Sequence, residues 1–542
     1  MTLFIIAALA AVILAVGYEA VTGQAKVKAR LLREFGVVPS GDYRHASVGK
    51  YWQAYRAANA PADAIDDTTW DDLTMEEVYY RVCNCTTTVG QDYLYALLHM
   101  PCDSGEREKL IALFEDAGLR LSTQLTLAKL GKKICANLDE LLFASQNYAL
   151  DAPWRYPLFA VLPLFSLALL LLSPELGGIC LLASLGNNVF QYFAVKNKTS
   201  HQLESLQYFA RLLGCARKLA PALAEKAPRT AALLEEACAP LKEIKFGASG
   251  GDGDSMTGAM VELLNMLTLF SIIQYNHVIG VLRKNLPAAQ RVYQLLGEVD
   301  AAISVVSYRR SLPLFCRPEF VGELRVEAQD LTHPLLADPV ENSAGITQCW
   351  LLTGSNASGK STFIKSVAVN LILAQTINTC TAARFVMRRA AVITSMAVAD
   401  NIVDGESYFI AEIKSMRRIL AYADTGAPCY CFIDEILKGT NTVERVAASA
   451  TVLAYLQRPN CLCMAATHDI ELTKMLEKTY RNMHFSEQVS EEGVTFDYLL
   501  KDGPSTTRNA IKLLEYYGFP AAVVTAANAA ANKAEAEKGV QT

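Results

Sequence analysis

Two apolar blocks interrupt the pattern of hydrophobic and polar positions along the chain. Residues 3–18 are uncharged and apolar, and a longer block covers residues 156–172 and 176–195. A membrane-spanning helix needs about 20 apolar residues, with a range of roughly 17–25. The first block therefore predicts a short transmembrane anchor, and the second, which is broken at Ser173-Pro174-Glu175, predicts a transmembrane helical hairpin.

The charges beside these blocks predict their orientation, because the cytoplasmic flanks of membrane helices are enriched in Lys and Arg. Cations follow the first block and stand at both ends of the second: Lys26, Lys28, Arg30, Arg33, Arg155, Lys196 and Lys198. Three spans with the N-terminus outside leave both large segments in the cytoplasm. We therefore predict a multi-pass protein of the cell membrane.

Each apolar block has an alternative interpretation. The first block also fits a cleaved signal peptide, although it lacks the basic region that precedes such peptides. The second also fits a buried helical hairpin in a soluble core, although Glu175 is its one charge.

The segments between the blocks carry helical patterns. Residues 31–150 lack strand alternation, and residues 199–245 and 259–310 repeat apolar positions at helical spacing. Residues 199–330 hold fourteen Lys or Arg and fourteen Asp or Glu, and this balance argues for solvated helix faces rather than a basic stripe for nucleic acid. The pair Arg417-Arg418 is likewise predicted to lie on a solvated helix face.

From about Val321, short apolar runs alternate with helical stretches. The runs Gln348–Thr353, Cys429–Ile433 and Cys461–Ala466 read as buried strands of a mainly parallel sheet. The whole pattern predicts five regions: an anchor at 1–25, a helical cytoplasmic region at 26–150, a transmembrane hairpin at 151–198, a helical lever region at 199–320 and an α/β domain at 321–542.

The segment GSNASGKST follows an apolar run and opens a helical stretch, and it fits the phosphate-binding pattern GxxxxGK[ST]. In that context, successive backbone N–H groups cradle phosphates at a helix N-terminus. Lys360 is expected to reach the β- and γ-phosphates of ATP, and Ser361 to bind Mg²⁺. A chance loop match is the alternative. The predicted nucleotide-binding residues are Gly354, Ser355, Asn356, Ala357, Ser358, Gly359, Lys360, Ser361 and Thr362.

Two further strands end in polar side chains. The run CYCFI delivers Asp434 and Glu435, and the run CLCMAA is followed by His468. Because parallel strands present their carboxyl ends at one edge, Asp434 is predicted to hold Mg²⁺ through water and Glu435 to activate the attacking water. His468 is predicted to sense the γ-phosphate, and a structural His capping the turn is the alternative.

Composition changes this picture little. The apolar fraction is 52% and the net charge is −5, so no bulk basic signal indicates nucleic acid. Fourteen cysteines include the pairs Cys83/Cys85, Cys429/Cys431 and Cys461/Cys463, which are spaced as on one face of a strand. Metal ligation by these pairs is an alternative, although their spacing is not that of a zinc site.

In their order along the chain, these motifs resemble the ATPase domain of the MutS family, over residues from about 290 to 528. The loop is similar to the family's GPNMxGKST, DEILKGTNT to DEIGRGTST, and ATHDIEL to ATHYFEL. Ser407 matches a serine that the family's second subunit contributes to the opposite nucleotide site. The resemblance implies an α/β P-loop ATPase domain, preceded by a mainly α-helical lever region with transmembrane helices. It also implies ATP and Mg²⁺ as cofactors and a homodimer formed through the ATPase domains.

The sequence also departs from the family. The hairpin at 156–195 stands about where the family carries its DNA clamp, and no Phe-x-Glu of a mismatch-reading domain lies near the start. DNA binding is therefore left open, and no mismatch-specific contact is expected. The leading hypothesis is a membrane-bound MutS-like ATPase that couples ATP hydrolysis to motion of helical arms. The alternatives are an ABC-type transport ATPase, which the lack of an LSGGQ-like signature opposes, and a membrane-tethered DNA-binding module.

Overall fold

The structure is a computed structural model. It describes residues 23–39, 48–61, 63–101, 105–132, 137–244, 256–355, 358–396, 408–437, 441–490, 493–505, 511 and 518–539. The predicted anchor at residues 1–25 lies almost wholly outside these ranges, and so does Ser407.

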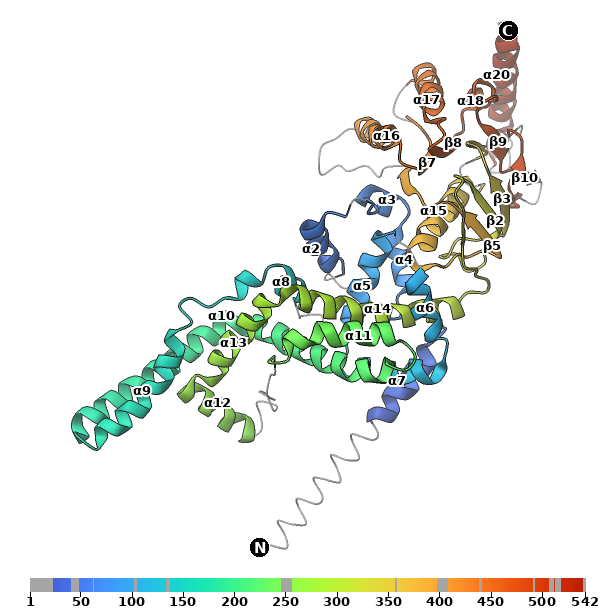
Figure 1. The fold of residues 1–542 in the computed structure, drawn as a ribbon. Helices are drawn as coiled ribbons and strands as arrows, with labels where there is room; N and C mark the ends of the chain where they lie inside the picture. Colours follow the sequence, from blue (N-terminus) through green and yellow to red (C-terminus); the bar gives the residue numbers. More distant parts are fainter. Residues whose placement is uncertain are drawn as a thin grey trace. The chain divides into compact units, whose positions relative to one another are not determined.

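The chain forms two compact units, which are described separately (Figure 1). The helical unit comprises residues up to Ala62, Val82–Leu97 and Gly105–Ser311. The sheet unit comprises Asp63–Arg81, Leu98–Ser104 and the chain from Leu312 onward. The two short N-terminal segments of the sheet unit are a feature that the sequence pattern did not indicate.

Helices build the first unit, as predicted. Its elements are α2 (Lys50–Asn59), α5 (Thr88–His99), α6 (Gly105–Leu113), α7 (Ala117–Ala128), α8 (Leu138–Phe143), η1 (Ser145–Tyr148), α9 (Arg155–Leu170), α10 (Pro174–Leu223), α11 (Pro228–Cys238), η2 (Ala239–Leu241), α12 (Met256–Thr268), α13 (Phe270–Lys284) and α14 (Leu286–Arg310).

Helices α9 and α10 form the hairpin that the second apolar block predicted. Pro174 begins α10, a position that suits proline because the first helical N–H groups have no partner within the helix. Helix α10 then continues for 50 residues, so the apolar part and the following amphipathic part are one helix rather than two regions. Among the described residues, one helical stretch, Pro174–Thr199, is both long and apolar enough to cross a membrane, and α9 is shorter.

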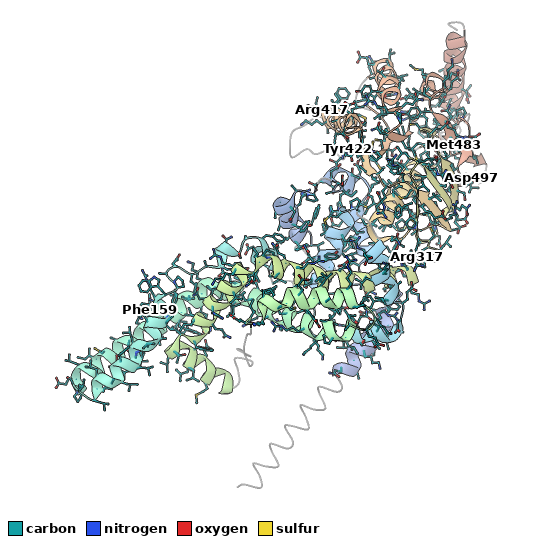
Figure 2. All side chains as sticks on the ribbon, in the orientation of Figure 1. Phe159, Arg317, Arg417, Tyr422, Met483 and Asp497 are labelled. Carbon is teal, nitrogen blue, oxygen red and sulfur yellow. The ribbon has the colours of Figure 1, made fainter. Side chains whose placement is uncertain are left out.

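The outer part of this hairpin exposes large apolar side chains. Leu171 and Leu172 at its turn are 89% and 85% exposed, and Leu164, Phe165 and Leu182 are at least half exposed. Figure 2 shows the side chains projecting outward along this part of the hairpin, on the stretch that includes the labelled Phe159. These side chains are not covered by the described part of the chain.

The sheet unit has the mixed α/β architecture that the sequence predicted. Its helices are α3 (Asp67–Asp72), α4 (Met75–Val82), α15 (Lys360–Ile377), α16 (Tyr408–Asp424), α17 (Thr442–Leu456), α18 (Ile470–Met475) and α20 (Ala521–Gly539). Its strands are β1 (Glu319–Phe320), β2 (Val326–Leu331), β3 (Asn342–Ile346), β4 (Trp350–Thr353), β5 (Arg384–Met387), β6 (Ala391–Ser395), β7 (Cys429–Asp434), β8 (Cys461–Ala466), β9 (Arg481–His484), β10 (Glu487–Ser490), β11 (Gly493–Phe496) and β12 (Lys501–Asp502).

The central sheet has the strand order β12-β9-β4-β8-β7-β6. All its pairs are parallel except β12 with β9. Strands β4, β8 and β7 are consecutive, with Leu352 opposite Ala466 and Ala466 opposite Asp434. Their carboxyl ends therefore lie side by side, which is where ligands bind in open parallel sheets.

Both faces of this sheet are covered by helices. One face, which includes Cys431 and Ile433, shares a buried cluster with Ile419 of α16 and Leu453 of α17. Helix α15 packs against β6, β7 and β8 and is buried along nearly its whole length. This two-sided burial explains why β7 and β8 read as continuous apolar runs.

Candidate functional site

The loop between β4 and α15 has the backbone that a phosphate-binding loop needs. Gly354 and Gly359 have φ values of +138° and +106°, which side chains disfavour. A Cβ on Gly354 would lie 2.5 Å from the carbonyl oxygen of Phe485. Glycine is therefore required at Gly354 by close backbone approach as well as by φ.

Lys360 begins α15, and its side chain turns back into the loop. It is 1% exposed, and its Nζ donates hydrogen bonds to the carbonyl oxygens of Gly354 and Ser355, the latter at 2.7 Å. Ser358 also closes the loop, because its hydroxyl donates to the Ser355 carbonyl at 2.7 Å. The described residues of the loop, on either side of 356–357, thus enclose a buried ammonium group.

Ser361 and Thr362 lie in the first turn of α15, where backbone N–H groups have no partner inside the helix and attract anions. Asn356 and Ala357 lie outside the described residues. Glu487, which sequence reasoning did not single out, accepts a hydrogen bond from the Ser355 hydroxyl at 3.0 Å. No spacing rule connects these two residues, since 132 positions separate them.

Asp434 and Glu435 lie at the carboxyl end of β7, which is paired with β8. The backbone N–H of Glu435 donates to the Ala466 carbonyl at 3.0 Å, and Glu435 has φ of +58°. This uncommon backbone conformation for a non-glycine residue is typical of functional positions. Asp434 has a buried Oδ1 atom without a hydrogen-bond partner in the described part of the chain. A buried carboxylate oxygen of this kind fits a water bound to a metal ion.

His468 approaches Glu435 from the end of β8. Its Nδ1 lies 3.6 Å from Oε1 of Glu435, and its side chain is half-exposed while that of Glu435 is buried. The neighbouring N–H of Thr467 donates to the Leu352 carbonyl at 2.9 Å, which ties this turn to β4. The structure therefore brings Lys360, Glu435 and His468, predicted from three separate motifs, to the ends of three adjacent strands.

The turn that carries His468 is held by an ion pair that the motifs did not reveal. Arg445 of α17 donates two hydrogen bonds to Asp469, at 2.7 and 3.0 Å. Both side chains are largely buried. Two-point Arg–carboxylate pairs fix geometry as well as charge, so Arg445 and Asp469 are positioning residues for His468.

A cavity of about 460 Å³ opens beside the loop and α15. Its lining includes Gly359 and Ser361 on one side and His333, Pro339 and Tyr498 on the other. Burial lowers the pKa of His333 to about 4, so this imidazole is neutral at pH 7. A flat, uncharged group such as a nucleotide base matches a cavity with these walls, next to the phosphate-binding turn.

A further cluster in the sheet unit joins α3 to β6. The Thr394 hydroxyl donates to Asp72 at 2.6 Å, and the Met396 N–H donates to the same carboxylate at 3.0 Å. Arg418 donates to Asp66 and to the Thr394 carbonyl. The prediction of a solvated face is therefore wrong for Arg418, because α3, which the apolar pattern did not place here, covers its side of α16.

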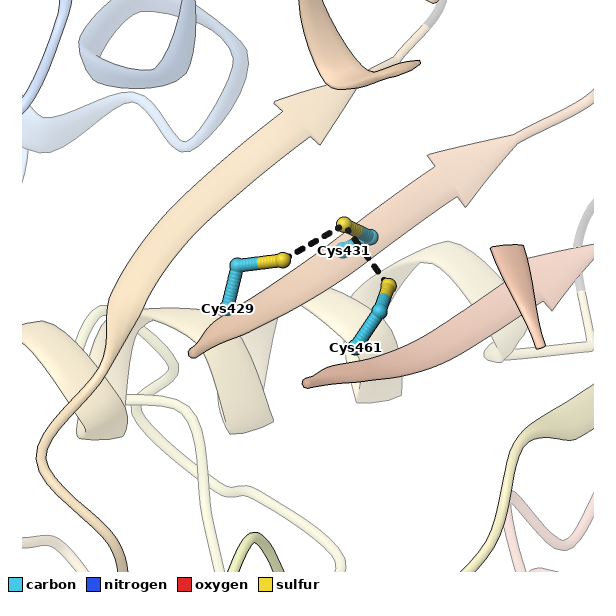
Figure 3. Close-up of side chains that lie close together, drawn as sticks. All are labelled: Cys429, Cys431 and Cys461. Atoms are coloured by element: carbon cyan, nitrogen blue, oxygen red, sulfur yellow. Dashed lines mark hydrogen bonds between the residues drawn. The ribbon is translucent and has the colours of Figure 1, made fainter. Parts of the chain in front are cut away.

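Three buried thiols meet at the start of β7 and β8 (Figure 3). The Sγ of Cys431 lies 3.8 Å from that of Cys429 and 3.4 Å from that of Cys461. Among the described residues, no histidine or carboxylate joins this group. Cys429, Cys431 and Cys461 all belong to the buried apolar cluster on this face of the sheet. Buried free thiols pack as small apolar side chains, so we interpret the three thiols as part of the core.

Comparison with known proteins agrees with the site. Residues 350–535 match the family model of MutS domain V. The DNA mismatch repair protein MutS from one strain of Thermus thermophilus is 28% identical over 260 residues, which is 46% of this chain and 30% of that protein. The protein of the same name from a second strain of that organism matches to the same extent. The chain thus covers 30% of the length of these curated relatives. The similarity to domain V of MutS proteins thus lies within the sheet unit, over residues 350–535.

Proposed function

We propose that this protein is a Mg²⁺-dependent ATP hydrolase of the MutS type that is bound to a membrane and acts as a dimer. One observation carries the enzymatic part. Lys360, the Asp434-Glu435 pair and His468 lie at the carboxyl ends of β4, β7 and β8, which are consecutive in one parallel sheet. The match of residues 350–535 to MutS domain V supports ATP hydrolysis at the level of the family.

The residues present fit both ATP and Mg²⁺. The turn around Lys360 offers backbone N–H groups and an ammonium group to phosphates, and the cavity lined by His333 and Tyr498 accepts the base. The Ser361 hydroxyl would bind the metal directly, and the buried Oδ1 of Asp434 would hold it through a water molecule. When bound, Mg²⁺ neutralises charge on the phosphates.

Three side chains take the remaining roles in ATP hydrolysis. The Glu435 carboxylate is placed to orient and deprotonate the attacking water, and its burial strengthens that interaction. His468, 3.6 Å away and half-exposed, is placed to hold the same water or a γ-phosphate oxygen. Lys360 exchanges its contacts with the loop carbonyls for phosphate oxygens and holds the charge that develops there.

The membrane part of the proposal rests on the hairpin. Its outer part is apolar and exposed around Phe165, Leu171 and Leu182. The stretch Pro174–Thr199 is long enough to cross the hydrocarbon layer. Arg155 and Lys198 stand at the opposite end from the turn. Cations are enriched on the cytoplasmic flanks of membrane helices, and this supports the proposal that the remaining helices and the sheet unit are cytoplasmic.

The dimer and its motion extend this proposal. Two sheet units pair head to tail, and Ser407 is assigned to the partner's nucleotide site by its resemblance to the family's serine. Closure of the two sites moves the helical arms and the hairpin, which requires contacts that differ between the ATP and ADP states.

The enzymatic claim is tested by Mg²⁺-dependent phosphate release from the purified full chain in detergent. We expect Lys360→Ala to lower the rate at least about 100-fold, because it removes the charge that binds the phosphates. Lys474→Ala, at an exposed position on α18, is the matched control and should keep the wild-type rate. Equal rates for wild type and Lys360→Ala would contradict the proposal.

DNA binding is a second candidate activity, because the curated relatives are named DNA mismatch repair proteins. It is tested by gel shift of duplex DNA at several salt concentrations, since phosphate contacts make affinity fall steeply with salt. A shift with a steep salt dependence would support it, and equal shifts for matched and mismatched duplexes are expected. Absence of a shift at low salt would contradict it.

A further inference from the structure

Helices α12 and α13 lie beside the α9–α10 hairpin (Figure 1). Both pack against α9 and α10, and the two helices meet at Leu269, whose φ is +52°. The apolar blocks of the sequence did not predict this pair as a membrane element, because α12 is 13 residues long and α13 ends in charged residues.

Two contacts fix how α12 runs along the hairpin. Glu262 of α12 pairs with Lys196, at the cytoplasmic end of the apolar part of α10. Further along, the Asn188 side chain donates to the Leu267 carbonyl at 2.8 Å. Asn188 precedes Lys196 by eight positions, which is about 12 Å at a rise of 1.5 Å per residue. Helix α12 therefore runs from the level of Lys196 toward the hairpin turn.

The outer face of α12 is apolar. Its large side chains, together with the first residue of α13, are between 50% and 63% exposed: Met260, Leu263, Leu264 and Phe270. Glu262 is the one charged residue in the α12 sequence, and it is paired. Helix α12, which packs against α9 and α10, thus exposes apolar side chains as the hairpin does.

The bend between the helices satisfies its own backbone groups. The Leu267 carbonyl accepts from Asn188, whose side chain is fully buried. The Thr268 hydroxyl donates to the Leu264 carbonyl at 2.7 Å and accepts from the Phe270 N–H at 3.4 Å. The Leu269 carbonyl accepts from two N–H groups of α13, at 3.0 and 3.1 Å. A broken helix at membrane depth needs such internal partners, because hydrocarbon provides none.

We propose that α12 and the start of α13 form a re-entrant segment, which enters the cytoplasmic leaflet beside the hairpin and turns back at Leu269. Lipid acyl chains cover its outer face. This inference rests on the proposed membrane insertion of the hairpin. The re-entrant segment would reach about 10 Å into the membrane from the level of Lys196, which is roughly a third of a hydrocarbon core of about 30 Å.

The test is photolabelling of the full chain in phosphatidylcholine–phosphatidylglycerol vesicles with an apolar, lipid-soluble diazirine, read by mass spectrometry. Leu164 and Phe165 are the positive controls for the hairpin. Val443 and Met475, exposed apolar residues of the sheet unit, are the controls in water, and Met475 matches the exposure of the α12 residues. We expect Leu263, Leu264 and Phe270, which follow Glu262, to be labelled at least about tenfold more than the water controls, because the reagent partitions into hydrocarbon.

Label on the hairpin but not on α12 would overturn this inference and leave the proposed membrane anchoring intact. If the hairpin and α12 were both labelled no more than the water controls, the re-entrant segment and the membrane anchoring would both be contradicted. A second arm uses Asn188→Leu, which removes the donor to the Leu267 carbonyl, with Asn187→Leu as control. We expect Asn188→Leu to change labelling of α12 at least about twofold while hairpin labelling is kept, because the exposed carbonyl is costly in lipid. No change would contradict the role of Asn188.

Discussion

The Tyr293 hydroxyl donates a hydrogen bond to the Asp92 carboxylate at 2.6 Å, inside the helical unit. Burial nevertheless raises the pKa of Asp92 to about 7. The folded chain therefore keeps a proton that the unfolded chain releases near pH 4. The contribution of Asp92 therefore lowers the free energy of unfolding as the pH rises from about 4 to about 7, by at most about 1.4 kcal/mol per pH unit.

This relationship predicts that Asp92→Asn stabilises the protein at pH 8 and has little effect at pH 4. Asparagine keeps the acceptor for Tyr293 and carries no charge to bury. The measurement is thermal unfolding of the full chain in detergent at both pH values. Glu235→Gln, at an exposed position on α11, should show no such pH dependence. A lower melting temperature for Asp92→Asn at pH 8 would contradict this assignment.

A second prediction concerns the Arg445–Asp469 pair that holds the His468 turn. Arg445→Met leaves Asp469 buried without its cation and should cost about 3 kcal/mol of stability. It should also lower kcat more than it raises KM, because it displaces His468 rather than the bound nucleotide. Arg458→Met breaks a more exposed pair with Asp424, which is worth about 1 kcal/mol or less. Similar losses of stability and unchanged kcat for both variants would show that Arg445 does not position the site.

A third prediction uses tryptophan fluorescence to test the hairpin. Trp52, Trp70 and Trp350 are at most 5% exposed, whereas Trp154, beside α9, is 64% exposed. Trp154 is placed at the interfacial level of the proposed membrane helix. Lipids brominated high in their acyl chains should therefore quench part of the fluorescence, and Trp154→Phe should abolish that quenching. Quenching of Trp154 by aqueous iodide instead of by the lipids would place the hairpin in water.

The thiol cluster gives a fourth prediction. If Cys431 is a core residue, Cys431→Ser buries a hydroxyl and should cost about 1–3 kcal/mol. Cys431→Ala leaves a smaller defect without a polar group and should cost less. Treatment of the wild-type protein with a strong chelator should leave its melting temperature unchanged. A lower melting temperature after chelation would instead indicate a metal held by the three thiols.

Much of the fold and the centre of the site could be predicted from the sequence. The phosphate-binding loop is a local signal, since Gly354 and Lys360 are set by backbone geometry within one turn. The ends of β7 and β8 are also local signals, and parallel topology then brings Glu435 and His468 together. The hairpin break was predictable because Ser173-Pro174 cannot continue a helix.

The remaining features depend on contacts between distant segments. Glu487 meets Ser355 across 132 positions, and Asp72 meets Thr394 across 322. Neither pair belongs to a motif with fixed spacing, so the pattern of the chain could not reveal them. The bend at Leu269 could not be predicted for a similar reason. The Leu267 carbonyl beside it bonds to Asn188, which lies 79 positions earlier on another helix.

The most direct test of the proposed ATPase is a comparison of wild type and Glu435→Gln, in which nucleotide binding and phosphate release are measured on the same preparations. Glutamine keeps the shape of the side chain but cannot deprotonate water, so we expect hydrolysis to fall by about 10²–10⁴-fold while ATP binding is retained. Glu444→Gln, at an exposed position on α17, should match wild type in both measurements. Phosphate release by Glu435→Gln at the wild-type rate, or failure of the wild-type protein to bind ATP, would contradict the account.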